Sequence, residues 1–366
     1  MISLSTRQLN RALLARQFLI QRTQLPELDV LEHLIGLQSQ APNPAYISLW
    51  TRIEGFAHES LSTLLINRSA VRIALMRSTI FLVTSRDCLT LRPLLQSVLN
   101  NGLKGAYGRS LTDVDLTTLA AISRSLVEER PRTFNELGII LQESWPETDQ
   151  HALSVAARTL VPLVQIPPRG IWGSSGQAIH TSAEHWLNRP LNTNFKLDDL
   201  ILRYLKAVGP ATISDMQAWS GLTRIREVTE RLRHRLIIFL NAAGKELFDI
   251  PDAEIPEADT SVPVRYLGEF DIVLLSHKDR TRIMADEYRN RVFTVNGIIK
   301  ATILIDGFVQ GLWRIEKNKG TATLVVEPFI PLSHLDKESL TTEGIKLLAF
   351  VAPEFTVQEI QFINPA

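Results

Sequence analysis

The chain has 366 residues, 45% of them hydrophobic and 21% charged, which is enough apolar material for two or three folded domains. Its 18 glycines show no collagen-like period, and a single cysteine, Cys88, excludes a disulfide-held fold. No apolar run reaches the roughly 18 residues that a membrane helix needs. We therefore expect a protein of the reducing cytoplasm with no membrane partner.

Positive charge is concentrated at the start of the chain, although the net charge is +0. Residues 1–110 carry 12 Lys and Arg against 6 Asp and Glu, and no acidic residue precedes Glu27. This opening resembles an organellar transit peptide. Because Leu9, Leu13 and Ile20 suit one helical face, we favour a first helix of the fold whose basic side chains could follow a phosphate backbone.

The first predicted unit covers residues 1–110. Hydrophobic spacing predicts helices over 6–21, 29–37 and 60–67, and two apolar runs at 70–75 and 79–83 predict a hairpin. Met76-Arg77-Ser78 forms its turn. Three helices followed by a two-stranded wing is the order of a winged helix.

Two further units, 111–190 and 191–252, repeat this order. Pro131-Arg132-Thr133-Phe134-Asn135-Glu136 matches Pro210-Ala211-Thr212-Ile213-Ser214-Asp215. In each copy the Thr can cap a helix and the acidic residue can bond back, as in a capping box. The strands follow at 163–166 and 171–172 in one unit and at 236–240 and 247–250 in the other.

The remaining segment, 253–366, follows an acidic, proline-containing linker at 251–263. Its apolar runs predict strands over 272–275, 298–305, 308–315, 321–327 and 355–362, with a helix over 335–351. The predicted fold class is therefore α+β: three tandem winged-helix units followed by a C-terminal β-rich, barrel-like domain, curved around DNA.

Most enzyme motifs are absent from the sequence. It contains no glycine-rich phosphate loop, no His-Glu-x-x-His, no paired cysteines and no Gly-x-Ser-x-Gly, and its eight histidines lack metal-ligand spacing. We expect neither a metal nor another cofactor.

Two glutamines stand out at the end of an apolar helix, in Gly36-Leu37-Gln38-Ser39-Gln40-Ala41-Pro42. An extended i, i+2 pair projects from one side of the chain, so Gln38 and Gln40 could act together if the helix unwinds before Pro42. From the residues alone, two glutamines solvating a helix end is the commoner arrangement.

This segment, with Ser48-Leu49-Trp50-Thr51-Arg52 after it, resembles the Gln-x-Gln motif of the AlkZ-type bacterial DNA glycosylases, a winged-helix family associated with azinomycin resistance. Further similarities follow in order along the chain: Leu75-Met76-Arg77-Ser78-Thr79, Val83-Thr84-Ser85-Arg86-Asp87, Leu267-Gly268-Glu269-Phe270-Asp271 and Ser276-His277-Lys278-Asp279-Arg280. Ser39 departs from the family, whose middle residue is usually aliphatic or Ala. A sister branch has Asp at the position of Gln40.

The resemblance implies a monofunctional DNA glycosylase with Gln38 and Gln40 as catalytic residues. N7 alkylation makes a purine a cationic leaving group, so cleavage needs a positioned water more than an acid. The carbonyl oxygens of the two amides would accept from that water. The expected substrate is double-stranded DNA with alkylated or crosslinked purines, excised by a monomer at the nucleoid without full flipping of the base.

Two turns are candidate DNA contacts. Met76, Arg77 and Ser78 offer an apolar wedge beside a cation, and Lys317 and Lys319 offer phosphate contacts. A plain polar turn is the alternative for both. The helix with Arg224, Arg226, Arg231, Arg233 and Arg235 could read a major groove, or pair with Glu227 and Glu230. The competing function is a winged-helix DNA-binding protein without catalysis, such as a regulator or a damage-binding factor.

Overall fold

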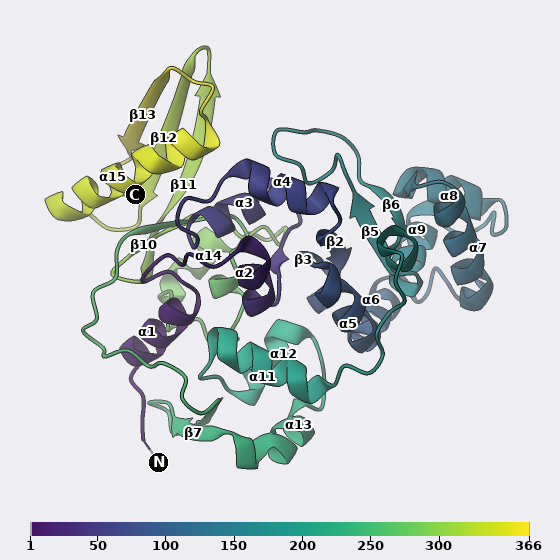
Figure 1. The fold of residues 1–366 in the computed structure, drawn as a ribbon, viewed down its shortest axis with the longest axis horizontal. Helices are drawn as coiled ribbons and strands as arrows, with labels where there is room; N and C mark the ends of the chain where they lie inside the picture. The colour runs from purple at the N-terminus through teal and green to yellow at the C-terminus, as the bar shows by residue number, and fades with distance from the viewer. Residues whose placement is uncertain (1, 366) are drawn as a thin grey trace.

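The computed structural model describes residues 2–365, whose elements are drawn in Figure 1. The longer helices are α1 (Thr6–Arg16), α2 (Glu27–Leu34), α3 (Asn43–Trp50), α4 (His58–Ile66), α5 (Ser85–Leu94), α6 (Gln96–Tyr107), α7 (Leu116–Glu129), α8 (Phe134–Gln142), α9 (Gln150–Leu160), α11 (Leu197–Val208), α12 (Ile213–Ser220), α13 (Ile225–Leu232) and α15 (His334–Val351). Shorter ones are α10 (Ala183–Leu187) and α14 (Arg289–Val292). None of the helices in this range is long and apolar enough to cross a membrane.

The first two predicted units contribute strands to one sheet, but the second strand of the second unit, predicted at 171–172, lies instead at Ile179–Ser182 after a longer loop. The strands of the sheet are β1 (Leu37–Gln38), β2 (Ala70–Ala74), β3 (Ile80–Thr84), β4 (Arg132–Thr133), β5 (Leu163–Ile166) and β6 (Ile179–Ser182), in the order β1-β3-β2-β5-β6-β4. The two hairpins meet where Arg72 of β2 pairs with Gln165 of β5. The sheet therefore spans both units, and the strand that carries Gln38 lies at its edge.

The repeated capping motif is confirmed at both helix starts. In the first copy the Thr133 hydroxyl accepts from the Glu136 N–H at 3.2 Å, and the Glu136 carboxylate accepts from the Thr133 N–H at 2.7 Å. Thr212 and Asp215 exchange the same pair of bonds at 3.1 and 2.9 Å before α12. In the third unit, α11, α12 and α13 are followed by the two-stranded sheet of β7 (Ile237–Leu240) and β8 (Glu246–Asp249).

The C-terminal segment forms an open sheet. Its strands β9 (Arg265–Leu267), β10 (Thr302–Ile305), β11 (Phe308–Asn318), β12 (Thr321–Pro328) and β13 (Val357–Phe362) lie in the order β13-β12-β11-β10-β9. Because β9 and β13 are edges and the sheet does not close, the barrel-like description is not confirmed. The predicted strand at 272–275 is wrong: the Asp271 side chain accepts from the Val273 N–H at 3.1 Å and starts a 3₁₀ turn, Ile272–Leu274.

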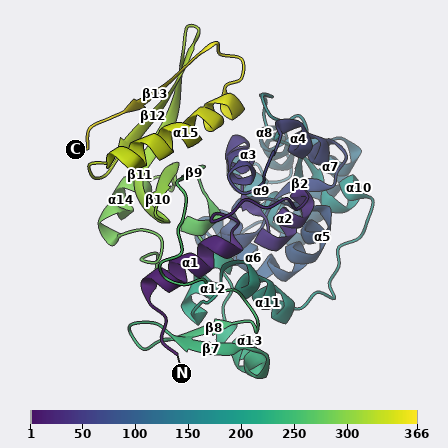
Figure 2. The ribbon, with the colours of Figure 1, turned by 60° about the vertical axis from the view of Figure 1, so that its left-hand side comes forward.

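Helix α1 lies between the five-stranded sheet and α11 (Figure 2), and most of its residues are buried. Arg11 and Arg16 face inward rather than toward a nucleic acid, which corrects the expectation from the sequence, while Arg7 is partly exposed and pairs with Asp306. Arg16 pairs with Asp249 at 2.7 Å, and the fully buried Arg11 pairs with Asp306. One apolar cluster runs from α1 through β2, β3, α11 and α12 to the C-terminal sheet, so the predicted units share a core.

Candidate active site

The Gln38 strand begins at a turn that only glycine can form. Helix α2 ends at Leu34, Ile35 takes a left-handed conformation with φ 58°, and Gly36 follows with φ 84°. A Cβ on Gly36 would lie 2.5 Å from Val83 Cγ1 and 2.7 Å from the Leu82 carbonyl oxygen. This close approach lets β1 pair with β3, and the Ser39 N–H donates to the Ile80 carbonyl at 2.7 Å. The glutamine segment is therefore extended, as the sequence reasoning required.

Gln38 is nearly buried, and its amide is held by Arg77. The guanidinium donates from Nη2 to Gln38 Oε1 at 2.7 Å and from Nη1 to the carbonyl oxygen of Trp219 in α12. Arginine has donors only, so the atom of Gln38 that faces it must be the oxygen. The Gln38 amino group consequently points away from Arg77.

Gln40 is exposed, and its amide is oriented from the backbone. Its Oε1 accepts from the N–H of Ile80 at 2.9 Å. A backbone N–H can only donate, so this oxygen is also identified by chemistry. Each glutamine keeps one free lone pair on its carbonyl oxygen and both protons of its amino group.

Ser39, between the two glutamines, faces a second buried arginine. Arg72 donates from Nη2 to the Ser39 carbonyl at 2.6 Å and from Nε to the Ser39 hydroxyl at 3.3 Å. The hydroxyl itself donates to the Ala41 carbonyl at 3.2 Å. Arg72 is 1% exposed, and burial lowers its pKa to about 10. The serine that stands where the family usually has an aliphatic residue or Ala thus has Arg72 as a hydrogen-bond partner for its hydroxyl.

Arg77 carries a positive charge into this site. Burial, and secondarily the charge of Arg280, lower the pKa of Arg77 to about 10, which still leaves the guanidinium charged at neutral pH. The residue lies in the turn between β2 and β3 with φ 54°, a left-handed conformation that directs its side chain back under β1. It therefore links β1, which carries Gln38, to α12 instead of projecting from the hairpin tip.

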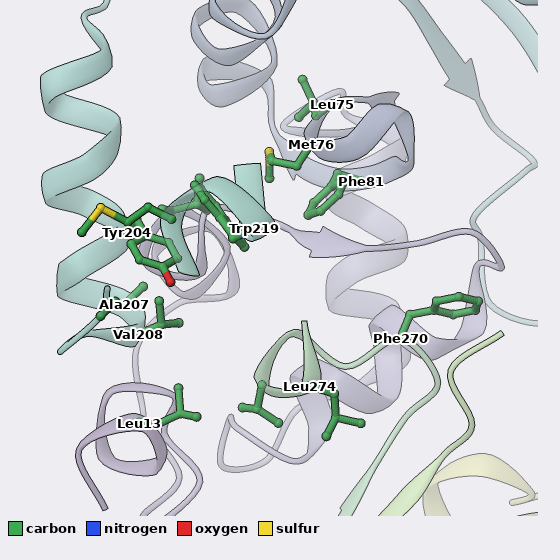
Figure 3. Packing of buried hydrophobic residues seen from close by; sticks show 14 of the residues in the cluster. Leu13, Leu75, Met76, Phe81, Tyr204, Ala207, Val208, Trp219, Phe270 and Leu274 are labelled. Atoms are coloured by element: carbon green, nitrogen blue, oxygen red, sulfur yellow. The ribbon is translucent and has the colours of Figure 1, made fainter. Parts of the chain in front are cut away.

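Met76 and Ser78 are not placed as an exposed wedge. Met76 is 0% exposed and lies in the apolar cluster with Trp219 and Phe81, as Figure 3 shows. An apolar wedge must be free to enter a groove, so Met76 does not fit the role expected from the sequence. Ser78 is half-buried, and a Cβ on Gly102 would lie 2.7 Å from its hydroxyl.

The lysine hairpin is placed as expected, at the exposed tip between β11 and β12. Lys317 donates to the Glu354 carboxylate at 2.9 Å and to the Val351 carbonyl at 3.2 Å. Lys319 is exposed and forms no ion pair with any of residues 2–365. A groove of about 370 Å³ separates this hairpin from the start of α3, and its walls include Asn43, Pro44, Ile47, Trp172, Trp313 and Lys317.

The sequence reasoning missed the two arginines that hold the glutamine segment. Both lie on the predicted first hairpin, Arg72 in the middle of an apolar strand and Arg77 at the turn. A charged residue within an apolar strand was the available signal for Arg72. As for metal ligands, residues 2–365 contain no group of three or more His, Cys, Asp or Glu side chains that could hold an ion.

Comparison with known proteins identifies the class of enzyme. Residues 31–350 match the family described as DNA glycosylase AlkZ-like, so the chain belongs to the AlkZ-like DNA glycosylases and is a DNA glycosylase. This membership favours the enzyme over the non-catalytic DNA-binding protein.

Two matches come from Streptomyces sahachiroi. One is the "Interstrand DNA cross-link repair glycosylase", 25% identical over 360 residues, which cover 92% of this chain and 95% of that protein. The solved structure of Streptomyces sahachiroi DNA glycosylase AlkZ superposes with a TM-score of 0.81 at 22% identity, covering 99% of this chain and 100% of the other. The mixed α and β fold is therefore that of AlkZ.

Proposed function

We propose that the protein hydrolyses the N-glycosidic bond of N7-alkylated purines in duplex DNA, including bulky adducts and interstrand crosslinks, with Gln38 and Gln40 as its catalytic residues. The observation that carries this proposal is the pair of amides on one extended segment, each with its carbonyl oxygen held by a donor of the protein. A site built from these two amides supplies no acid of its own that could protonate a base. It suits a leaving group that is already cationic.

The two amides have different roles in this mechanism. Arg77 draws electron density from Gln38 Oε1, which makes the Gln38 amino group a stronger donor. That amino group donates to the oxygen of the attacking water and aims it at C1′. Gln40 accepts a hydrogen bond from the same water with the free lone pair of its Oε1. As the water oxygen bonds to C1′, the N7-alkylpurine leaves as a neutral base with the electrons of the N-glycosidic bond, and the proton of the water is released to solvent. This division differs from the expectation that both carbonyl oxygens accept from water. The charge of Arg77 makes the remaining lone pair of Gln38 Oε1 a poorer acceptor than that of Gln40 Oε1, whose partner is a neutral N–H.

An acceptor role for Gln40 agrees with the sister branch of the family, which has Asp at this position. A carboxylate can accept from water but cannot donate to it when ionised, so the substitution is compatible with an acceptor and incompatible with a donor. Gln38 is the residue for which a carboxylate would be unsuitable.

The surroundings of the site suit a large lesion. Gln40 is exposed rather than enclosed, so a base need not enter a closed pocket to reach it. The groove of about 370 Å³ between α3 and the β11–β12 hairpin offers room for the alkyl part of an adduct. Lys317 and Lys319 at the hairpin tip would contact phosphates. The name of the Streptomyces sahachiroi relative supports crosslinks among the substrates.

The lesion range can be tested with three duplexes of one sequence: undamaged, with a single N7-methylguanine, and with a single N7-linked interstrand crosslink. Heating in alkali after incubation converts abasic sites to strand breaks that a denaturing gel resolves. We expect breaks at both lesions and none in the undamaged duplex. Excision of undamaged purines at a comparable rate, or no excision of either lesion, would contradict the proposal.

A further inference from the structure

A second feature of the fold is a groove rich in unpaired cations beside α12. It has a volume of about 670 Å³ and lies between the start of α12, the β7–β8 turn and residues 278–289. Its basic side chains come from three separate segments: Arg226, Lys245, Lys278, Arg280 and Arg289. Because these segments are far apart in the sequence, the cluster could not be predicted from any one helix or hairpin.

The cations of the groove lack carboxylate partners. Within residues 2–365, none of these five side chains forms an ion pair, whereas Arg231 and Arg233 on the same unit pair with Asp198 and with Glu230 and Glu246. The arginines of α13 and of the turn that follows it therefore fall into two groups. Arg231 and Arg233 form ion pairs, and Arg226 lines the groove.

Most acidic residues of the groove are already engaged. Asp215 accepts from the N–H groups of Thr212 and Lys278 at 2.9 Å each. Glu246 accepts from Arg233 at 2.6 Å, and Asp279 accepts from the Thr281 hydroxyl at 2.7 Å. Asp286 is the remaining carboxylate at the rim. Hydrogen bonds from neutral groups do not cancel the charge of a carboxylate, so Asp215, Asp279 and Asp286 still count against the five cations. The groove keeps a net positive charge.

Two of the cations are held close to each other. The guanidinium groups of Arg280 and Arg289 lie 4.7 and 5.6 Å from the centroid of the same ring, Phe293. Burial, and secondarily the charge of Arg289, lower the pKa of Arg280. Like charges held together in this way are relieved by an anion bound between them.

Helix α12 connects the groove to the glutamine site. Its first residues line the groove, and the Trp219 carbonyl near its end accepts from Arg77.

We infer that this groove binds the phosphate backbone of the DNA beside the glutamine site, through Arg226, Lys245, Lys278, Arg280 and Arg289. The occupant is a run of phosphodiesters of duplex DNA, bound without regard to base sequence. The inference rests on DNA being the substrate of the proposed function, but not on the lesion or on the glutamines.

Binding to an undamaged, fluorescently labelled duplex tests the groove separately from catalysis. Affinity is measured by anisotropy over a series of NaCl concentrations for the wild type, for Lys278→Gln/Arg289→Gln and for Arg226→Gln/Lys245→Gln. The control is Arg231→Gln/Lys337→Gln, which removes two exposed cations outside the groove. All six positions are exposed, and thermal melts verify that each variant is folded.

Each lost phosphate contact should lower the slope of log K against log salt by about 0.9, so each groove variant should lose a slope of about 2 while the control keeps the wild-type slope. Equal slopes for the groove and control variants would overturn the inference, even if the wild type excises lesions. A reduced slope in a protein that excises no lesion would support the groove and overturn the proposed function instead.

Discussion

Arg77 Nη2 donates to Gln38 Oε1 at 2.7 Å, so a charged, partly buried guanidinium fixes the orientation of the Gln38 amide. The same guanidinium binds the Trp219 carbonyl of α12. A residue expected at the DNA surface from the sequence thus supports the active site from within. The glutamine segment pairs with β3 of the first hairpin, and the turn of that hairpin packs against α12.

Replacement of Arg77 should slow excision more than it weakens DNA binding. Arg77→Ala removes a charge-assisted hydrogen bond worth about 1.5–3 kcal/mol, which corresponds to a roughly 10- to 100-fold slower single-turnover rate. Arg77→Lys supplies one charged donor and should recover part of that loss. Exogenous guanidinium should partly rescue Arg77→Ala if the residue positions Gln38, whereas a purely structural defect would not respond.

Carboxylate substitutions should distinguish the two glutamines. Gln38→Glu places an acceptor-only group against Arg77 and removes the donor to water, so we expect a single-turnover rate lower by about 10²–10³. Gln40→Glu keeps an acceptor beside the Ile80 N–H and should retain most of the rate. Equal losses in the two variants would contradict the assigned donor and acceptor roles.

Ser39→Ala should affect stability slightly and activity little. The variant loses the 3.3 Å contact from Arg72 Nε and the 3.2 Å bond from the hydroxyl to the Ala41 carbonyl. It keeps the 2.6 Å bond from Arg72 Nη2 to the Ser39 carbonyl. One such contact is worth about 0.5–1.5 kcal/mol in the free energy of unfolding. Urea denaturation measures this change, and a large fall in excision rate would show that the hydroxyl does more than pack.

Stability should decline in mild acid because of a buried histidine. Burial lowers the pKa of His180 from 6.5 to about 4. Between pH 6.5 and 4 the unfolded chain therefore binds a proton at this histidine that the folded protein does not bind. The stability that the neutral His180 contributes is fully present above pH 6.5 and is lost as the pH falls toward 4. The free energy of unfolding should drop by about 1.4 kcal/mol per pH unit for this group.

His180→Phe provides the comparison, because it preserves the stack on Phe134, whose ring centroid lies 4.0 Å away. Urea denaturation at pH 7.5, 6.0 and 5.0 should give a shallower pH dependence for the variant. His277, whose pKa burial lowers to about 3, contributes in the same direction and remains in both proteins. Parallel pH dependences would show that His180 is not the responsible group.

Local chemistry was readable from the sequence where partners are close in the chain. The capping boxes at Thr133 and Thr212 depend on residues three positions apart. The extended glutamine pair was predicted from Pro42, two positions after Gln40. Contacts between distant segments were not readable. Arg16 of the first predicted unit pairs with Asp249 of the third, and β2 of the first unit pairs with β5 of the second.

Arg77 shows why a turn residue is difficult to place. A polar turn sequence suggests exposure, but the left-handed φ of 54° reverses the direction of the side chain and brings it under β1. That conformation is favoured by the packing of α12 against the turn, where a Cβ on Gly221 would lie 3.5 Å from the Arg77 nitrogen. The carbonyl that receives Arg77 belongs to a helix more than 140 positions further along the chain.

The most direct test of the central claim is the single-turnover rate of N7-methylguanine excision for the wild type, Gln38→Ala and Gln40→Ala, each at saturating protein. If the two amides position the attacking water, each alanine variant should be slower by about 10²–10³, with unchanged affinity for undamaged duplex. Wild-type rates in both variants would contradict the account and would place the catalytic centre elsewhere in the protein.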